Sequence, residues 1–200
     1  MPWPEPVTLR GRYATLEPLT LAHHDAMAAA TRDGELWKLW YTIVPSPEGM
    51  QNEIARRLHL QTTGWMLPFA VLDADGTPVG MTTYMNIDAT HKRVEVGSTW
   101  YAKRVQRSAL NTECKLLLMT HAFETLSCIA VEYRTSFMNH QSRRAIERLG
   151  AKLDGVLRNH QRHMDGSLRD TCVYSITESE WPAVKTHLEF QLQSRVSAER

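Results

Sequence analysis

A polar, basic turn between an expected strand and an expected helix is the part of this chain best suited to bind a ligand. It lies within residues 100–115, which read WYAKRVQRSALNTECK. The helix is expected to continue to Phe123, because apolar residues recur there at helical spacing. The first N–H groups of a helix lack intrahelical partners, and the helix dipole adds to their attraction for phosphate. The turn is therefore a candidate pyrophosphate site. An ordinary helix start capped by Asn111 or Thr112 would explain the same residues without a ligand.

Three further residues have side chains suited to proton transfer or hydrogen bonding. Glu95 lies in the strand before the turn, and Asn139 and Ser142 stand three residues apart at the start of a short expected helix. Each also has a plain structural interpretation. Glu95 could pair with Arg93 or Arg134, while Asn139 could serve only as an N-cap with Ser142 as a polar first-turn residue.

The cysteines and histidines do not indicate a metal centre or a disulfide framework. The three cysteines are odd in number and lack a paired metal-ligand spacing, so reduced, buried thiols are expected at Cys114, Cys128 and Cys172. Adjacent histidines at 23 and 24 would point to different faces of a helix, and those at 160 and 163 to opposite faces of a strand. No metal site is predicted.

Composition favours one domain of enzyme size. The chain has 200 residues, 23 of them basic and 22 acidic, with a net charge of +1. This balance gives no bulk attraction to nucleic acid or to a membrane surface. No apolar run approaches the roughly 20 residues of a membrane span, and the first residues do not resemble a secretory signal. A single domain over residues 1–200 in the cytoplasm is the expectation.

The hydrophobic pattern predicts a mixed α/β sheet. Helices are expected after Thr20 to about residue 31, briefly around 36–40, from Ser46 to about 63, after the basic turn, and at 141–149. A hairpin turn is expected at residues 73–76. The expected strands are residues 9–17, 66–72, 77–86, 93–101, 129–137, 153–158 and 168–176.

From residue 79 to 181 the sequence resembles the GCN5-related N-acetyltransferase (GNAT) superfamily, in its ribosomal-protein N-terminal acetyltransferase (RimJ/RimL-type) branch. Each motif is weak alone, but their order is specific, and residues 9–19 resemble the first strand of that family. The motifs besides the basic turn are VG at 79–80, VEVG at 94–97, HAFE at 121–124, NHQS at 139–142, AIERLGA at 145–151, GVLR at 155–158, RD at 169–170, YSI at 174–176 and EW at 180–181.

The resemblance implies a GNAT-type fold: a mixed, mostly antiparallel twisted sheet with splayed parallel fourth and fifth strands, flanked by helices. Those two strands would be residues 94–101 and 129–137, and the pantetheine arm of acetyl-CoA would bond to the backbone between them. Residues 9–90 would form the acceptor side, where Trp37, Trp40 and Tyr41 would line a pocket or simply belong to the core. Residues 91–181 would bind acetyl-CoA, with Lys115 among the charged groups around the turn. The implied cofactor-binding residues are Trp100, Tyr101, Arg104, Gln106, Arg107, Ser108, Ala109, Leu110, Asn111, Thr112 and Asn139.

One departure from the family pattern concerns the phosphate-binding loop. That loop reads Gln or Arg, two residues, Gly, one residue, then Gly or Ala, whereas the chain has Gln106, Ala109 and Asn111 at those places and no glycine. Glycine takes positive φ without steric cost. Alanine adds only a methyl group, and asparagine tolerates left-handed conformations better than most residues. We therefore expect the loop to keep its phosphate-binding shape.

The implied reaction is acetyl transfer from acetyl-CoA to a primary amine by direct attack. Glu95 would be the general base and Ser142 the proton donor to the departing thiolate. The branch favours the α-amino group of a peptide or protein as acceptor, and homodimers are common in it. Two alternatives stay open: acetylation of a small-molecule amine such as an amino acid, polyamine or antibiotic, and a catalytically altered domain that only binds CoA or another protein.

Overall fold

The computed structural model describes residues 3–198 and contains one eight-stranded sheet in the order β1-β2-β3-β4-β5-β6-β8-β7. Every neighbouring pair is antiparallel except β5 and β6, which confirms the expected mixed sheet. The strands are β1 (Leu9–Arg10), β2 (Ala14–Pro18), β3 (Met66–Asp73), β4 (Pro78–Asp88), β5 (Arg93–Tyr101), β6 (Ala130–Ser136), β7 (Lys152–Arg162) and β8 (Leu168–Thr177).

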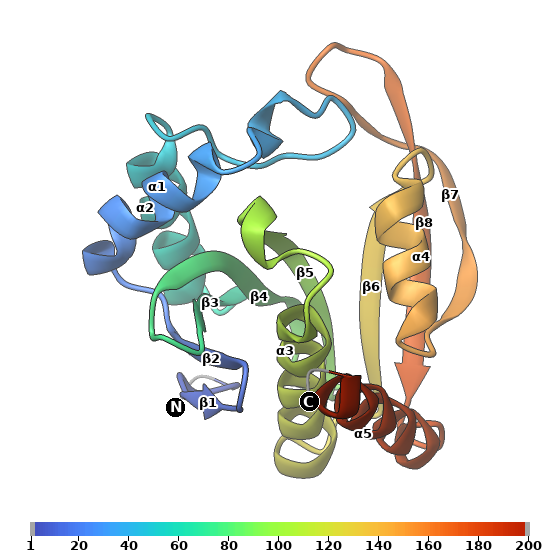
Figure 1. Cartoon of the computed structure of the whole chain (residues 1–200). Helices are drawn as coiled ribbons and strands as arrows, with labels where there is room; N and C mark the ends of the chain where they lie inside the picture. The colour runs from blue at the N-terminus through green and yellow to red at the C-terminus, as the bar shows by residue number, and fades with distance from the viewer. Residues whose placement is uncertain (1–2, 199–200) are drawn as a thin grey trace.

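Helices cover both faces of this sheet (Figure 1). They are α1 (His24–Arg32), α2 (Met50–Thr62), α3 (Ala109–Thr120), α4 (His140–Arg148) and α5 (Trp181–Ala198). Thr83 of β4 accepts a hydrogen bond from Arg57 of α2, whereas the adjacent Tyr84 donates one to the Leu118 carbonyl of α3. Because neighbouring residues of a strand point to opposite faces, α2 and α3 lie on opposite sides of the sheet.

The parallel strands β5 and β6 pair only at their beginnings. Their register joins Arg93 to Ala130, Val94 to Val131 and Glu95 to Glu132, and no rung follows. Beyond that point the strands diverge, as Figure 1 shows in the middle of the sheet. We call the opening between residues 96–101 of β5 and 133–136 of β6 the β5–β6 wedge. The expected splay of the fourth and fifth strands is confirmed, and it leaves backbone groups of both strands without a partner in the ladder.

Several element boundaries differ from the sequence expectation. The single strand expected at residues 9–17 is a hairpin of β1 and β2, because the N–H groups of Arg12, Tyr13 and Ala14 turn toward the carboxylate of Glu113 on α3 instead of joining a ladder. Helix α2 begins only at Met50, since Ser46 caps a preceding turn by accepting from the Gly49 N–H.

Helix α5 was not anticipated from the sequence, although Thr177, Glu180 and Pro182 form a plausible helix start. Its Trp181 ring stacks on Phe123, with centroids 5.2 Å apart, and the indole donates to Glu124 at 2.9 Å. These contacts fix α5 against the π-helical turn His121–Thr125 that continues α3. They thereby brace the helix that follows the basic turn.

Candidate active site

The basic turn leads from β5 through a short 3-10 helix, Lys103–Val105, into α3. Helix α3 begins at Ala109, and the hydroxyl of Ser108 accepts from the Leu110 N–H at 3.2 Å. The N-cap is therefore Ser108, and the interpretation with Asn111 or Thr112 as cap is wrong because both residues already lie in the first helical turn. The remaining first-turn N–H groups point toward the turn, as a phosphate site requires.

The turn contains no glycine, and its left-handed residue is Arg107, with φ of +62°. Ala109 and Asn111 stand where the family pattern has small residues, but both are helical here and need no positive φ. The side-chain amide of Gln106 donates to the Tyr101 carbonyl at 2.9 Å, which connects the turn to the end of β5. The guanidinium of Arg104 donates to Asp73, at the end of β3, at 2.8 Å.

Several predicted cofactor residues are buried, so only their backbone could meet a ligand. The side chains of Trp100, Tyr101, Leu110 and Thr112 lie in the interior. Lys115 is also buried, with 6% of its surface exposed. It therefore does not belong to the charged rim of the turn, and the rim consists of Arg104, Arg107 and their exposed neighbours.

A bulge in β5 changes which face its residues occupy. Gly97 pairs with Thr83 and Trp100 with Met81, so Ser98 and Thr99 together oppose Thr82, and Ser98 takes φ of +48°. Without a bulge, Thr99 would share a face with Glu95, four residues before it. With the bulge the alternation is shifted by one residue, so Glu95 faces α2 and Thr99 faces α3.

Arg57 of α2 holds this bulge from one face and was not identified from the sequence. Only 2% of the residue is exposed. Its guanidinium donates to the Ser98 carbonyl at 3.0 Å, to Thr83 at 2.9 Å and to Glu53 at 2.7 Å. The spacing of Glu53 and Arg57 signals a helical ion pair, but nothing local in the sequence indicates that the arginine is buried.

Glu95 is a buried carboxylate at the start of the β5–β6 wedge. It is 5% exposed, accepts from the Asn86 amide at 2.5 Å and lies 3.7 Å from the guanidinium of Arg134. Burial raises the pKa of Glu95, and this effect outweighs the lowering by Asn86 and Arg134. Of the structural alternative, the pairing with Arg134 exists, but Glu95 is not an exposed strand residue. A carboxyl with a raised pKa holds a proton more readily, as a general base must.

Asn139 and Ser142 lie at the other end of the wedge, after β6. The Asn139 side-chain oxygen accepts from the Ser142 N–H at 3.0 Å, so Asn139 is the N-cap of α4. This contact occupies only the oxygen, and the amide of Asn139 still has two donors for a ligand. Within the described residues no hydrogen bond links Ser142 to Glu95. Ser136 lies four residue steps along β6 from the Glu132 rung, about 13 Å of strand.

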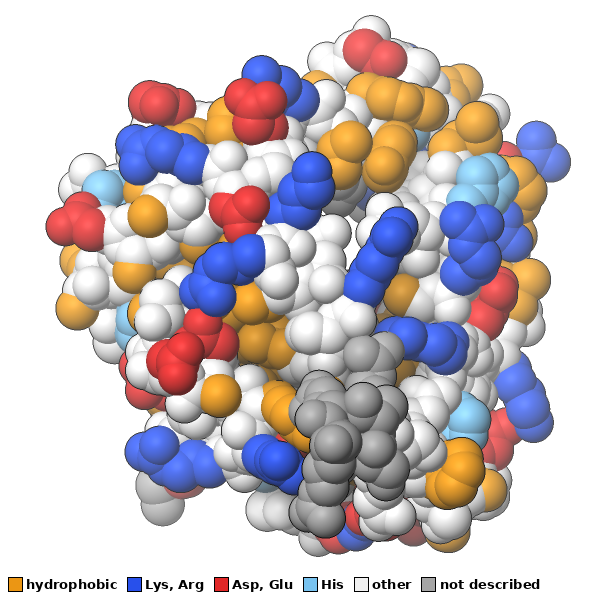
Figure 2. Space-filling view, in the orientation of Figure 1, with side chains coloured by type: hydrophobic (Ala, Val, Ile, Leu, Met, Phe, Trp, Pro, Cys, Tyr) orange, Lys and Arg blue, Asp and Glu red, His pale blue; other side chains and the backbone are white. Residues whose placement is uncertain are grey.

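The two halves of the chain meet again beyond the open end of the wedge. Trp40, which is 51% exposed, packs its ring edge-on against His163 of the turn between β7 and β8, with centroids 5.1 Å apart. Trp40 and its neighbour Tyr41 are therefore not core residues. Figure 2 shows Lys and Arg side chains across the middle of this face and a hydrophobic patch above them.

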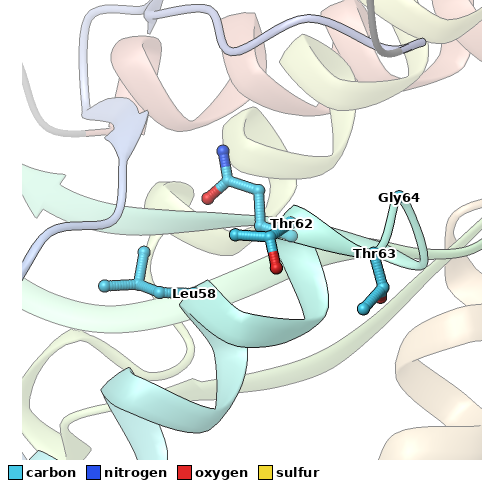
Figure 3. A pocket seen from close by; sticks show the side chains of 5 residues that line it. Leu58, Thr62, Thr63 and Gly64 are labelled. Atoms are coloured by element: carbon cyan, nitrogen blue, oxygen red, sulfur yellow. The ribbon is translucent and has the colours of Figure 1, made fainter.

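The hollow at the end of α2 is not a candidate catalytic site. It measures about 670 Å³ and is lined by Leu58, Gln61, Thr62, Thr63 and Gly64 (Figure 3). None of these side chains is titratable. Among the residues that the structure describes, no group of three His, Cys, Asp or Glu side chains could hold a metal ion. None of the described helices is long and apolar enough to cross a membrane.

Residues 14–152 match the acetyltransferase (GNAT) domain family. The chain belongs to this family. Its members are acetyl-CoA-dependent enzymes, and both ends of the match fall within the sheet described above. The resemblance inferred from the ordered motifs is thereby confirmed.

Named relatives agree with this assignment. A Bacillus subtilis (strain 168) protein named "Putative ribosomal N-acetyltransferase YdaF" is 31% identical over 111 residues, covering 56% of this chain and 60% of that protein's length. A GCN5-related N-acetyltransferase from Brucella melitensis is 31% identical with a TM-score of 0.85, covering 96% of this chain and 87% of that one. Mycobacterium smegmatis RimJ in complex with CoA-disulfide is 20% identical with a TM-score of 0.78, covering 94% and 95% of the two chains, and shows the shared fold.

Proposed function

We propose that this chain transfers an acetyl group from acetyl-CoA to a primary amine by direct attack, in a single domain with an acceptor side at about residues 9–90 and a donor side at about 91–181. The observation that carries the proposal is the junction of the β5–β6 wedge with the N-terminus of α3. The wedge offers unpaired strand edges to the linear, amide-bearing pantetheine arm of acetyl-CoA. The N-terminus of α3 offers N–H groups and basic side chains to the phosphates.

The donor site divides into two parts. The phosphate turn has Arg104 beside it and consists of Gln106, Arg107, Ser108, Ala109 and Asn111. Leu110 and Thr112 contribute only backbone groups. Trp100 and Tyr101 offer backbone groups of β5, and Asn139 offers its free amide from the far side of the wedge. When bound there, acetyl-CoA supplies a thioester carbonyl that an amine can attack.

Glu95 is the proposed general base, acting directly or through water on the ammonium form of the acceptor. Its position on the α2 face, at the closed end of the wedge, separates it from the phosphate turn by most of β5. Ser142, whose hydroxyl has no hydrogen bond to a described residue, is the proposed donor of a proton to the thiolate. No cysteine is suited to carry the acetyl group, because all three are buried and burial raises their pKa values, to about 12 for Cys114 and about 11 for Cys128.

The proposed acceptor is the α-amino group of a peptide or protein. The support is the likeness to a relative named as a ribosomal N-acetyltransferase and a ring cluster at the mouth of the acceptor side, formed by the exposed Trp40 and the half-buried Tyr41 and His163. A cytoplasmic location and a homodimer belong to the same proposal. A small-molecule amine as acceptor is the alternative.

Thermal unfolding with acetyl-CoA tests the donor site. A ligand that binds only the folded state raises the melting temperature by mass action, so acetyl-CoA should stabilise the wild type. Asn111→Glu places a carboxylate in the partly exposed first turn of α3, beside the proposed phosphate position, and should abolish the shift. Glu48→Ala, on the exposed turn before α2, is the control and should keep it. No shift in the wild type at millimolar acetyl-CoA would sink the proposed function. A shift without thiol release across an amine panel would favour a domain that binds CoA without catalysis.

A further inference from the structure

A buried lysine projects into the β5–β6 wedge from the α3 side. The ammonium of Lys115 donates to the Thr99 hydroxyl of β5 at 3.1 Å and lies 5.9 Å from the centroid of the Tyr133 ring on β6. Both partners come after the last rung that joins the two strands, Glu95 to Glu132. Lys115 therefore spans the two strands at the level where they have separated.

The ammonium of Lys115 is under-satisfied. It carries three N–H donors, and in the described part of the chain only Thr99 accepts from it, with no carboxylate forming an ion pair. Burial lowers its pKa to about 8. A buried cation whose neighbours are one hydroxyl and one aromatic ring costs folding free energy. A ligand that supplies further acceptors would offset part of that cost.

The position within the wedge decides what that ligand can be. Lys115 lies between the phosphate turn, where α3 begins, and Glu95 at the closed end of the wedge. A molecule that runs along the wedge from the phosphate turn toward Glu95 passes the level of Thr99 and Tyr133, where the ammonium lies. Carbonyl oxygens along such a molecule are suitable acceptors for its two remaining donors.

We propose that Lys115 is a ligand-binding residue of the wedge, which donates hydrogen bonds to carbonyl oxygens of the pantetheine and thioester part of acetyl-CoA. This inference rests on the proposed function. In this proposal the ammonium of Lys115 binds the pantetheine arm of the cofactor and not its phosphates. The bulge at Ser98 is required, because it turns Thr99 to the α3 face where Lys115 can reach it.

Calorimetric titration with two probes tests this assignment. Acetyl-CoA carries the arm, whereas adenosine 3′,5′-bisphosphate resembles only the nucleotide end. Lys115→Met should weaken acetyl-CoA binding roughly ten- to hundred-fold, as expected for losing hydrogen bonds from a charged donor. It should leave adenosine 3′,5′-bisphosphate binding unchanged. Lys152→Met removes an exposed lysine on β7 and should change neither affinity.

The outcomes separate the inference from the function on which it rests. If the wild type does not bind acetyl-CoA, the proposed function fails. If the wild type binds and Lys115→Met binds equally well, Lys115 only fills the wedge and the inference alone is overturned. Equal weakening for both probes would also overturn it. The variant should fold, because methionine is cheaper to bury than an unpaired ammonium, and its melting temperature checks this.

Discussion

At the residue scale, the candidate site combines side chains that would be costly in an ordinary interior. Glu95 is a buried carboxylate whose partners are the side-chain amide of Asn86 and the guanidinium of Arg134. Asn139 is both a helix cap and a potential ligand donor. The capping interpretation of Asn139 is correct as far as its oxygen is concerned, and a role for its amide stays a prediction.

Glu95→Gln should separate catalysis from stability. Turnover should fall by roughly 10²–10⁴ if the carboxylate is the general base, and the loss should shrink at high pH, where the acceptor amine is already neutral. Stability should not fall. Burial raises the folded-state pKa of Glu95, so the folded form holds the proton more tightly, and stability is lost as pH rises above the ordinary value of about 4.3. Glutamine removes that penalty at neutral pH.

A pH–rate series and thermal melts measure both effects. Glu132→Gln is the matched control, because Glu132 is the rung partner of Glu95 and also contacts Arg134, yet it lies on β6 and is only half-buried. Its turnover should change by less than about ten-fold. An unchanged profile for Glu95→Gln would move the base to water or to the substrate.

At the element scale, the bulge of β5 decides which groups meet in the wedge, and helices on both faces hold it. Arg57 of α2 fixes the Ser98 carbonyl from one side, and Lys115 of α3 contacts Thr99 from the other. Two further contacts keep α3 in place. Glu113 accepts from three successive backbone N–H groups of the β1–β2 turn, and α5 packs along the helix.

Arg57→Met should destabilise the fold by about 3 kcal/mol, because it leaves the Ser98 carbonyl and part of Glu53 without a buried partner. Arg56→Met is the control, since Arg56 pairs with the same Glu53 but is exposed and does not touch the bulge. Its cost should stay below about 1 kcal/mol. Urea unfolding compares the two variants. Equal losses would mean that Arg57 acts only through Glu53 and that the bulge does not depend on it.

At the scale of the whole molecule, two halves of the chain meet across the sheet. They join at the paired beginnings of β5 and β6 and meet again where Trp40 contacts His163 (Figure 1). Between those two places the strands are apart. The proposed function puts the acceptor side beside Trp40 and His163.

Trp40→Ala should therefore act on the acceptor and not on the donor. The contact with His163 is exposed, so the melting temperature and acetyl-CoA affinity should stay near the wild-type values, while KM for the acceptor rises. Trp65→Ala removes another partly exposed tryptophan, just after α2, and should leave all three quantities unchanged. Steady-state kinetics with any accepted peptide measures the difference. A change in acetyl-CoA affinity instead would assign Trp40 to the donor side.

The sequence by itself determined the features that depend on local pattern and motif order. Alternation predicted β5 and helical spacing predicted α3, because each pattern reports only which face of its own element is apolar. The turn residues at 73–76 predicted the hairpin after β3. The ordered motifs identified the family. They also singled out Glu95, whose neighbours Val94 and Val96 are buried as their types suggest.

Only the tertiary structure decided how those elements combine. Ser108 became the cap because the 3-10 helix before it set where α3 begins. Thr99 and Glu95 lie on opposite faces of β5 because of a bulge, which the alternation of apolar residues does not reveal. Glu113 reaches Arg12, 101 residues away in the sequence, and Lys115 and Arg57 are buried by strands that lie distant along the chain. The reason is physical: burial and hydrogen bonding between remote segments depend on how faces pack, and a local pattern carries no information about the surface that will cover it.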